Sequence, residues 1–143
     1  MPKLLVFAPC EKVLIDQDGN ASLIAMFNEL RRPSIADIPA NAQAPIRWNI
    51  LTLWYREPSD AERKFEQRCI LVAPDGSTAV DNRVEFAMSG GLMHRNVTTV
   101  FGFPISQAGE YSLSLRLKAA DEQGDGQEIA AFPMFVKIDE GKA

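Results

Sequence analysis

The chain has 143 residues, enough for one domain with a substantial core, and its 46% hydrophobic and 24% charged residues are an ordinary globular balance. The formal net charge is −4, and the densest basic cluster, Arg63-Lys64 with Arg68, is interleaved with glutamates. A face that binds nucleic acid concentrates basic charge, because neutralised phosphates supply most of its affinity. We therefore expect a single domain over residues 1–143 and no nucleic-acid partner.

Membrane insertion, export and structural zinc are also not expected. No stretch approaches the ~20 apolar residues of a membrane helix, and the apolar run at residues 4–8 is too short for an export signal. Cys10 and Cys69 lie in no CxxC motif, and His94 alone cannot complete a Cys/His zinc site. These features predict a cytoplasmic protein with free thiols, no membrane association and no cofactor.

Turn signals recur at short intervals along the chain, with β-rich runs between them. The first run, residues 3–16, changes the phase of its alternation around Pro9, which predicts a bend that lets one long strand serve two sheets. Asp18-Gly19-Asn20 then predicts a hairpin turn. Residues 21–32 combine helical spacing of apolar residues with that preceding turn and a following Pro33, so the local pattern leaves helix and strand equally open.

The middle of the chain predicts one long connection followed by a central strand. Residues 32–45 contain Pro33, Pro39 and Pro45, which exclude a helix or a central strand. Residues 46–56 are apolar on both faces over their second half, which is typical of a central strand. Further strands are expected in four runs, at residues 65–73, 80–89, 94–103 and 109–118, with a turn at Pro74-Asp75-Gly76.

The last run, residues 129–138, contains Pro133, which cannot donate a ladder hydrogen bond and therefore predicts an edge strand. One face of this run is apolar through Phe132, Met134 and Val136, and an exposed edge of this kind would promote aggregation. We expect the amino-terminal strand, the long loop or a second copy of the chain to cover it. A second copy would form a homodimer, because two edges related by a two-fold axis are self-complementary.

This rhythm of strands and turns indicates an all-β protein, an antiparallel β-sandwich of seven to nine strands. Ala108-Gly109-Glu110-Tyr111 opens the most regularly alternating strand, and it resembles the corner before a late strand of immunoglobulin-like sandwiches, where a tyrosine hydroxyl bonds nearby backbone. We therefore expect an immunoglobulin-like arrangement, with Tyr111 buried and its hydroxyl bonded to the backbone.

Two segments resemble a known family more closely. Residues 2–13 and residues 21–27, together with the later Gly109-x-Tyr111 strand, are similar to a family of small uncharacterised bacterial and phage proteins, a domain of unknown function. The resemblance implies a β-sandwich, and it favours a strand over residues 21–30. It brings no reaction and no binding residues to this chain.

The sequence offers few candidates for catalysis or cation binding. It has no G-x-S-x-G nucleophile motif and no phosphate-binding glycine loop. Ser89-Gly90-Gly91 precedes His94, but no third group is available to orient the histidine, so we interpret the glycines as a strand end. Asp16-Gln17-Asp18-Gly19-Asn20 lacks the spacing and the later glutamate of a calcium loop, so we interpret it as a turn. These motifs favour a protein that is not an enzyme, without settling the question, and no metal binding is expected.

The function itself is not determined by these patterns. The first hypothesis is a non-catalytic protein-interaction or assembly module, because loops on a rigid scaffold usually carry binding. The candidate interaction residues lie in the loop over residues 32–45 and on the last strand: Ile35, Asp37, Ile38, Phe132, Met134 and Val136. The alternative is a small-molecule-binding or enzymatic β-sandwich with a pocket near Trp48 and that loop, although Trp48 and Trp54 are expected to belong to the core.

Overall fold

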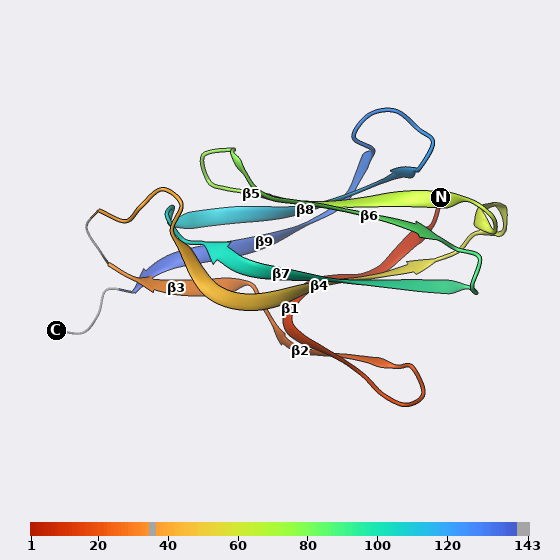
Figure 1. Ribbon diagram of the computed structural model, residues 1–143, viewed down its shortest axis with the longest axis horizontal. Helices are drawn as coiled ribbons and strands as arrows, with labels where there is room; N and C mark the ends of the chain where they lie inside the picture. The colour runs from red at the N-terminus through yellow and green to blue at the C-terminus, as the bar shows by residue number, and fades with distance from the viewer. Residues whose placement is uncertain (35–36, 140–143) are drawn as a thin grey trace.

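The computed structural model describes residues 1–34 and 37–139, and these residues form a sandwich of two β-sheets (Figure 1). Sheet A has the strand order β2-β1-β4-β7, and sheet B has the order β3-β9-β8-β5-β6. The all-β sandwich is therefore confirmed, with nine strands in the described residues. Their bounds are β1 Lys3–Ile15, β2 Ala21–Met26, β3 Glu29–Pro33, β4 Gln43–Tyr55, β5 Lys64–Val72, β6 Thr78–Ala87, β7 Met93–Pro104, β8 Gly109–Ala119 and β9 Gln127–Asp139.

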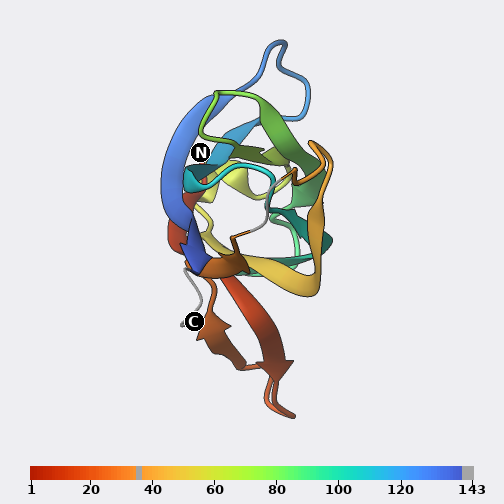
Figure 2. The same cartoon turned by 90° about the vertical axis from the view of Figure 1, so that its left-hand side faces the viewer.

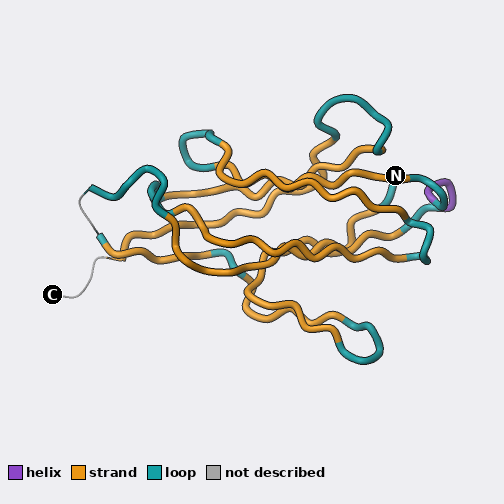
Figure 3. Tube along the Cα trace, viewed as in Figure 1, coloured by secondary structure: helices purple, strands orange, loops and turns teal. Residues whose placement is uncertain are grey.

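The hairpin of β1 and β2 stands off the body of the sandwich, as Figure 2 shows in an end view and Figure 3 in the Cα trace. Its turn forms where Asp18-Gly19-Asn20 predicts it. Asp16 Oδ1 accepts hydrogen bonds from the backbone N–H groups of Asp18 and Asn20, each at 2.9 Å, and Gly19 adopts a φ of 84°. The Asn20 N–H contributes most to holding the pKa of Asp16 below its ordinary value.

The expectation that the first strand serves two sheets is wrong. β1 pairs with β4 from Lys3 to Cys10 and with β2 from Cys10 to Ile15, and all three strands belong to sheet A. The change of phase is real, but its bulge lies between Leu4 and Val6 rather than at Pro9. Beyond Cys10 the strand leaves β4, so its two halves face different neighbours within one sheet.

Residues 21–26 and 29–33 form strands, so the strand alternative for residues 21–32 is correct and the helix alternative is wrong. β2 pairs antiparallel with β1, and β3 pairs in parallel with β9 in the opposite sheet. Phe27 lies between these two strands and is buried in the core, with its N–H donated to Pro9 O at 2.8 Å. The chain therefore crosses from sheet A to sheet B at this point, and the predicted long loop is shortened by β3 at one end and β4 at the other.

The expectation that the whole last strand is a sheet edge is wrong for its second half. β9 lies between β8 and β3, and β3 pairs with it from Phe135 to Asp139. Phe135 donates its N–H to Asn28 O, on the β3 side of β9. Residues two apart in a strand direct their N–H groups to the same side, so the N–H that Pro133 lacks would also point to the β3 side. β3 pairs with β9 only from Phe135 onward, so it does not reach Pro133. The proline thus lies where the ladder needs no donor, and the cover of the second half is intramolecular.

The core between the sheets is dominated by aromatic side chains. Phe27, Trp48 and Phe103 pack against one another at one end, with ring centroids 5.4 to 5.7 Å apart. Trp48 and Trp54 project inward from the central strand β4 and have no exposed surface, which confirms both the central strand and the assignment of the tryptophans to the core. Burial of each such side chain favours folding by about 1.5–3 kcal/mol.

Tyr111 occupies the corner that the sequence predicted. Its ring is buried against Phe103, at a centroid distance of 5.4 Å, and its hydroxyl donates to the backbone oxygen of Gln107 at 2.9 Å. Burial raises the pKa of the Tyr111 hydroxyl. The predicted buried tyrosine with a hydroxyl–backbone bond is confirmed.

Candidate functional site

The outer face of sheet B presents charges that are already paired. Arg68 on β5 contacts Asp81 at 2.7 Å and Asp125 at 3.1 Å, and Arg83 contacts Glu66 at 3.4 Å. The hydrogen bonds from Arg68 hold the pKa of Asp81 below its ordinary value. Such pairs between partly exposed groups contribute little stability, but they satisfy the hydrogen-bonding capacity of this face.

The outer face of sheet A has the opposite character. On β7 the side chains of Met93, Val97 and Phe101 are exposed, and Phe101 retains 75% of its surface although the Arg47 guanidinium lies 5.6 Å from its ring centroid. The hairpin adds four exposed apolar side chains, those of Leu14, Ile15, Ile24 and Met26. We call the side chains of Met93, Val97, Phe101, Leu14, Ile15, Ile24 and Met26 the apolar face. Several large exposed apolar side chains on one part of a molecule often mark an interaction site.

The contrast arises in part because β7 buries polar side chains and exposes apolar ones. Its inward residues include the polar side chains Asn96 and Thr98, which are buried, whereas the alternate positions Val97 and Phe101 face outward. Strand alternation places these two sets on opposite sides of the sheet. The strand therefore exposes residues of the type that a sandwich normally buries.

Polar contacts hold the hairpin against sheet A. Arg95 Nη1 donates to Gly19 O in the hairpin turn at 3.0 Å, and Asn49 Nδ2 donates to Glu11 O at 2.9 Å. Thr99 Oγ1 donates to Asn49 Oδ1 at 2.8 Å and orients that amide. The hairpin stands off the body, and one side chain at its base and one at its tip link it to sheet A.

Two open clefts flank the hairpin on this face. One, of about 470 Å³, lies under the tip and is mostly apolar, with lining residues that include Val6, Leu23, Leu51, Leu53 and Met93. The other, of about 460 Å³, lies at the base between the hairpin and the outer face of β4 and β7 and is lined by both apolar and charged side chains, among them Lys12, Leu14, Arg47 and Val97. Both are large enough to take side chains of a bound polypeptide, and their basic groups stand beside the apolar lining.

A polar network lies between the sheets, on the inner side of β4 and β7. Gln67 Oε1 on β5 accepts hydrogen bonds from Thr52 Oγ1 at 2.6 Å, Trp54 Nε1 at 2.9 Å and Asn96 Nδ2 at 3.1 Å. His94 Nε2 lies 2.8 Å from Asn96 Oδ1. Because the three donors of Thr52, Trp54 and Asn96 are satisfied within the protein, we interpret this network as a polar tie between the sheets and not as a ligand site.

The Ser89/His94 pairing has no catalytic geometry. His94 stacks on Phe86, with centroids 4.9 Å apart, and its ring nitrogen is engaged by Asn96 on the inner side of β7. Ser89 lies in the exposed connection after β6. Within residues 1–34 and 37–139, no group of three or more His, Cys, Asp or Glu side chains is placed to hold a metal ion.

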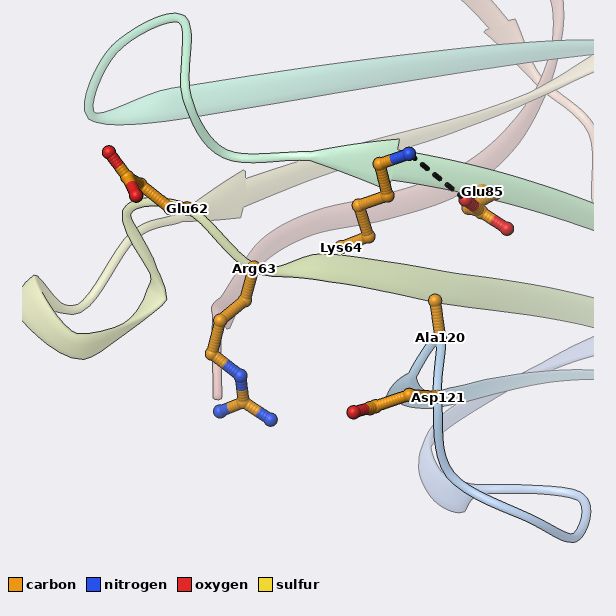
Figure 4. Close-up of a pocket in the computed structure, with 6 residues that line it drawn as sticks. All are labelled: Glu62, Arg63, Lys64, Glu85, Ala120 and Asp121. Atoms are coloured by element: carbon orange, nitrogen blue, oxygen red, sulfur yellow. Dashed lines mark ion pairs between the residues drawn. The ribbon is translucent and has the colours of Figure 1, made fainter.

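Charged side chains surround a further cleft where β5 begins (Figure 4). Lys64 Nζ lies 4.0 Å from Glu85 Oε1, and Arg63 and Asp121 lie on the other side of the β5 ribbon in this view. Glu62 points away from Arg63, so the six lining residues do not converge on one point. With both signs of charge present and partly paired, this cleft has no preference for a ligand of one charge.

The candidate interaction residues from the sequence do not form one site. Met134 and Val136 are buried in the core with 1% exposure each, so their assignment to an accessible surface is wrong. β3 pairs with β9 from Phe135 onward, and both side chains belong to the core between the sheets. Phe132 is partly buried against the same core.

The loop candidates also lie apart from the apolar face. Ile35 lies outside the described residues, Asp37 is exposed with a φ of 62°, and Ile38 is partly buried. The loop contributes Ala40, Asn41 and Ala42 to a shallow cleft of about 200 Å³ beside Tyr111. Trp48 does not line this cleft, because its side chain is fully buried and its indole N–H is bonded to Gly102 O at 3.0 Å.

The apolar face was not predicted from the sequence, although the sequence does show apolar residues on both sides of the hairpin turn. Leu14 and Ile15 precede the hairpin turn and Ile24 and Met26 follow it, so the hairpin carries apolar side chains on more than one face. A hairpin with this composition must either be buried or offer a binding surface. The outward direction of Phe101, by contrast, requires knowledge of the strand register.

In the part of the chain that the structure describes, no helix has the length and apolar character needed to cross a membrane. No family model matches the chain, and no curated protein matches it, so the similarity to an uncharacterised bacterial and phage family stays a prediction.

Proposed function

We propose that this protein is a non-catalytic protein-interaction or assembly module that binds a polypeptide partner through the apolar face of sheet A. The contrast between the two outer faces carries the proposal: sheet B presents paired charges, whereas sheet A presents Val97, Phe101 and the apolar hairpin side chains to solvent. Exposing such a surface costs solubility, so an interaction is the simplest reason for it.

The surroundings of the face indicate the chemistry of the partner. Lys12 and Arg47 line the cleft at the base of the hairpin, where Glu11 is the acidic neighbour, and Arg95 lines the cleft under its tip. A segment with apolar side chains flanked by carboxylates would fill the clefts and pair with these cations. Apolar anchors at the centre with charges at the rim are the usual arrangement of protein interfaces.

An immunoglobulin-like arrangement and a cytoplasmic location are part of this proposal. The hydroxyl bond of Tyr111 to Gln107 O supports the first, because such a corner recurs in immunoglobulin-like sandwiches. The burial of Cys10 and Cys69 in different sheets supports the second.

The test uses a displayed library of random peptides panned against the whole protein. We expect the enriched peptides to combine apolar and acidic residues, and to lose affinity by about tenfold in the variants Ile24→Lys and Met93→Ser, which remove apolar anchors. Arg83→Ser, on the outer face of sheet B, is the matched control and should bind as the parent does. Enrichment of no peptide, or equal loss in the control, would contradict the proposal.

A further inference from the structure

We infer that the free edge of β7 pairs with the β7 of a second copy, in antiparallel orientation about a two-fold axis at Thr99. The inference rests on the proposed interaction function, since it names a partner for the same side of the molecule. β7 is the edge strand at one side of sheet A and, within the described residues, pairs with β4 alone.

The other three edges are protected against strand addition. β6 carries Asp81, Arg83 and Glu85 along its outer side. β3 is short and contains two arginines and Pro33. β2 is short as well, and Ala25 within it has a φ of 55°, which interrupts the regular conformation. Charges, prolines, irregularities and short length are the common means by which edges avoid pairing.

The β7 edge has none of these protections over most of its length. Residues 96–104 carry no charge, and valine, threonine and phenylalanine fill most positions. The strand spans Met93–Pro104, and its protective features lie near its ends: Arg95 at one, and Gly102, with a φ of 86°, and Pro104 at the other. A long, uncharged edge of β-branched and aromatic residues is a template for another strand.

The pairing pattern with β4 shows which backbone groups of β7 are free. Arg56 donates its N–H to Leu92 O at 2.8 Å, so this pair is hydrogen-bonded, and the same register continues through Trp54 with His94 and Ile50 with Thr98. Hydrogen-bonded and non-hydrogen-bonded pairs alternate in antiparallel sheets. The odd-numbered residues from Arg95 to Phe101 therefore direct their N–H and C=O groups toward the open edge.

Pairing about Thr99 makes the best use of these groups. It places Val97 of each copy opposite Phe101 of the other and brings the two Thr99 residues together as a hydrogen-bonded pair. Aromatic pairs with β-branched residues and threonine pairs are favourable across strands. Phe101, 75% exposed in the single chain, would then be covered on the side of the new strand.

Charge distinguishes this self-pairing from the alternatives. Centring on Thr99 keeps Arg95 of one copy far along the strand from Arg95 of the other. The corresponding pairing of β6 about Arg83 would oppose the two Arg83 side chains and would set Asp81 against Glu85. Like charges directly opposite are destabilising, so β7 is suited to a second copy of this chain and β6 is not.

The first experiment is disulfide trapping of the full chain. Across a hydrogen-bonded pair the Cα atoms lie about 5.5 Å apart, within the roughly 4.4–6.8 Å that a disulfide spans. We expect Thr99→Cys to form an intermolecular disulfide under mild oxidation. Val97→Cys should not do so alone, because the offset along the strand is roughly 14 Å, but it should cross-link to Phe101→Cys in a mixture. Ser22→Cys on β2 is the control, and the native thiols are buried.

The second experiment is sedimentation at micromolar concentration with matched lysine variants. Thr99 and Ile24 are both exposed, so Thr99→Lys and Ile24→Lys each add one charge to the surface. In the proposed pairing only Thr99→Lys brings two like charges directly opposite each other, so we expect the parent and Ile24→Lys to be dimers and Thr99→Lys to be a monomer. A monomeric parent, a dimer that survives Thr99→Lys, or a cross-link of Val97→Cys with itself would overturn the inference.

The two proposals fail separately in these experiments. Loss of peptide binding in Ile24→Lys with a monomeric parent would leave the interaction module standing and remove only the second copy. A β7-linked dimer that binds no peptide would support the edge pairing and contradict the peptide site.

Discussion

The two sides of β7 differ in an unusual way: polar side chains face the core, and apolar side chains face solvent. Its inner side contributes Asn96 to the hydrogen-bond network around Gln67, and its outer side presents Val97 and Phe101 to solvent. The polar groups inside are satisfied by partners from the opposite sheet, whereas the apolar groups outside have water as their neighbour. Burial in β7 therefore follows the partners available across the sandwich rather than residue type alone.

Of the two phenylalanines near the end of β7, the buried Phe103 is expected to give the largest loss of stability on substitution, and the exposed Phe101 the smallest. Phe103 is 1% exposed and packs between Trp48 and Tyr111. Phe103→Ala should lower the free energy of unfolding by about 3–5 kcal/mol, because it removes a buried ring and leaves a cavity. Urea unfolding measures the change. A loss below about 1 kcal/mol would show that this end of the core is not closed.

The next prediction concerns the polar tie. Gln67→Leu should cost roughly 2–4 kcal/mol, because the hydroxyl of Thr52, the indole N–H of Trp54 and the amide of Asn96 lose their common acceptor while buried. Adding Thr52→Val to Gln67→Leu should cost less than Thr52→Val alone, since its acceptor is already gone. Additive losses in urea unfolding would contradict a shared network.

The third prediction is a pH dependence at the buried thiol of the same network. Burial raises the pKa of Cys69, to which Gln67 Nε2 donates, from 9.0 to about 12. The unfolded chain releases this proton first, so the stabilisation is complete below pH 9.0 and is lost as the pH rises toward 12. Stability should fall more steeply above pH 9.0 in the parent than in Cys69→Ala. Equal slopes for the two proteins would contradict this.

The smallest effect is expected outside the sandwich. Phe101→Ala should change the free energy of unfolding of the single chain by no more than about 0.5 kcal/mol, because the ring has little to lose on the outer face. The measurement is urea unfolding at a concentration where the protein is monomeric. A cost close to that of Phe103→Ala would mean that Phe101 is covered, and the contrast between the two sides of β7 would be lost.

The elements that depend on neighbouring residues were predictable. The turns at Asp18-Gly19-Asn20 and Pro74-Asp75-Gly76 form as expected, with Gly19 and Gly76 at positive φ. The alternation of β8 placed Tyr111 in the core. The cross-over of β3 was not predictable, because its parallel pairing with β9 joins segments far apart in the chain. For the same reason Met134 and Val136 were predicted to be accessible on an edge strand, although both are buried in the core.

The candidate site was predictable only in part. Exposed apolar residues on both sides of the hairpin turn could have been read from the sequence, but their position over sheet A depends on Arg95 reaching Gly19 O. Phe101 and Phe103 differ by an even number of positions, so alternation places them on one face. Gly102, with a φ of 86°, and the bulge in β4 between Ala44 and Arg47 turn them to opposite faces.

The sequence by itself determined an all-β sandwich, its turns, its central strand and the tyrosine corner, because these follow from backbone preferences and alternation over a few residues. Only the tertiary structure decided which edges are covered, which polar groups meet at Gln67 and which apolar residues stay exposed. Those outcomes depend on contacts between strands that are distant in the chain, and a periodic pattern does not specify which strands become neighbours.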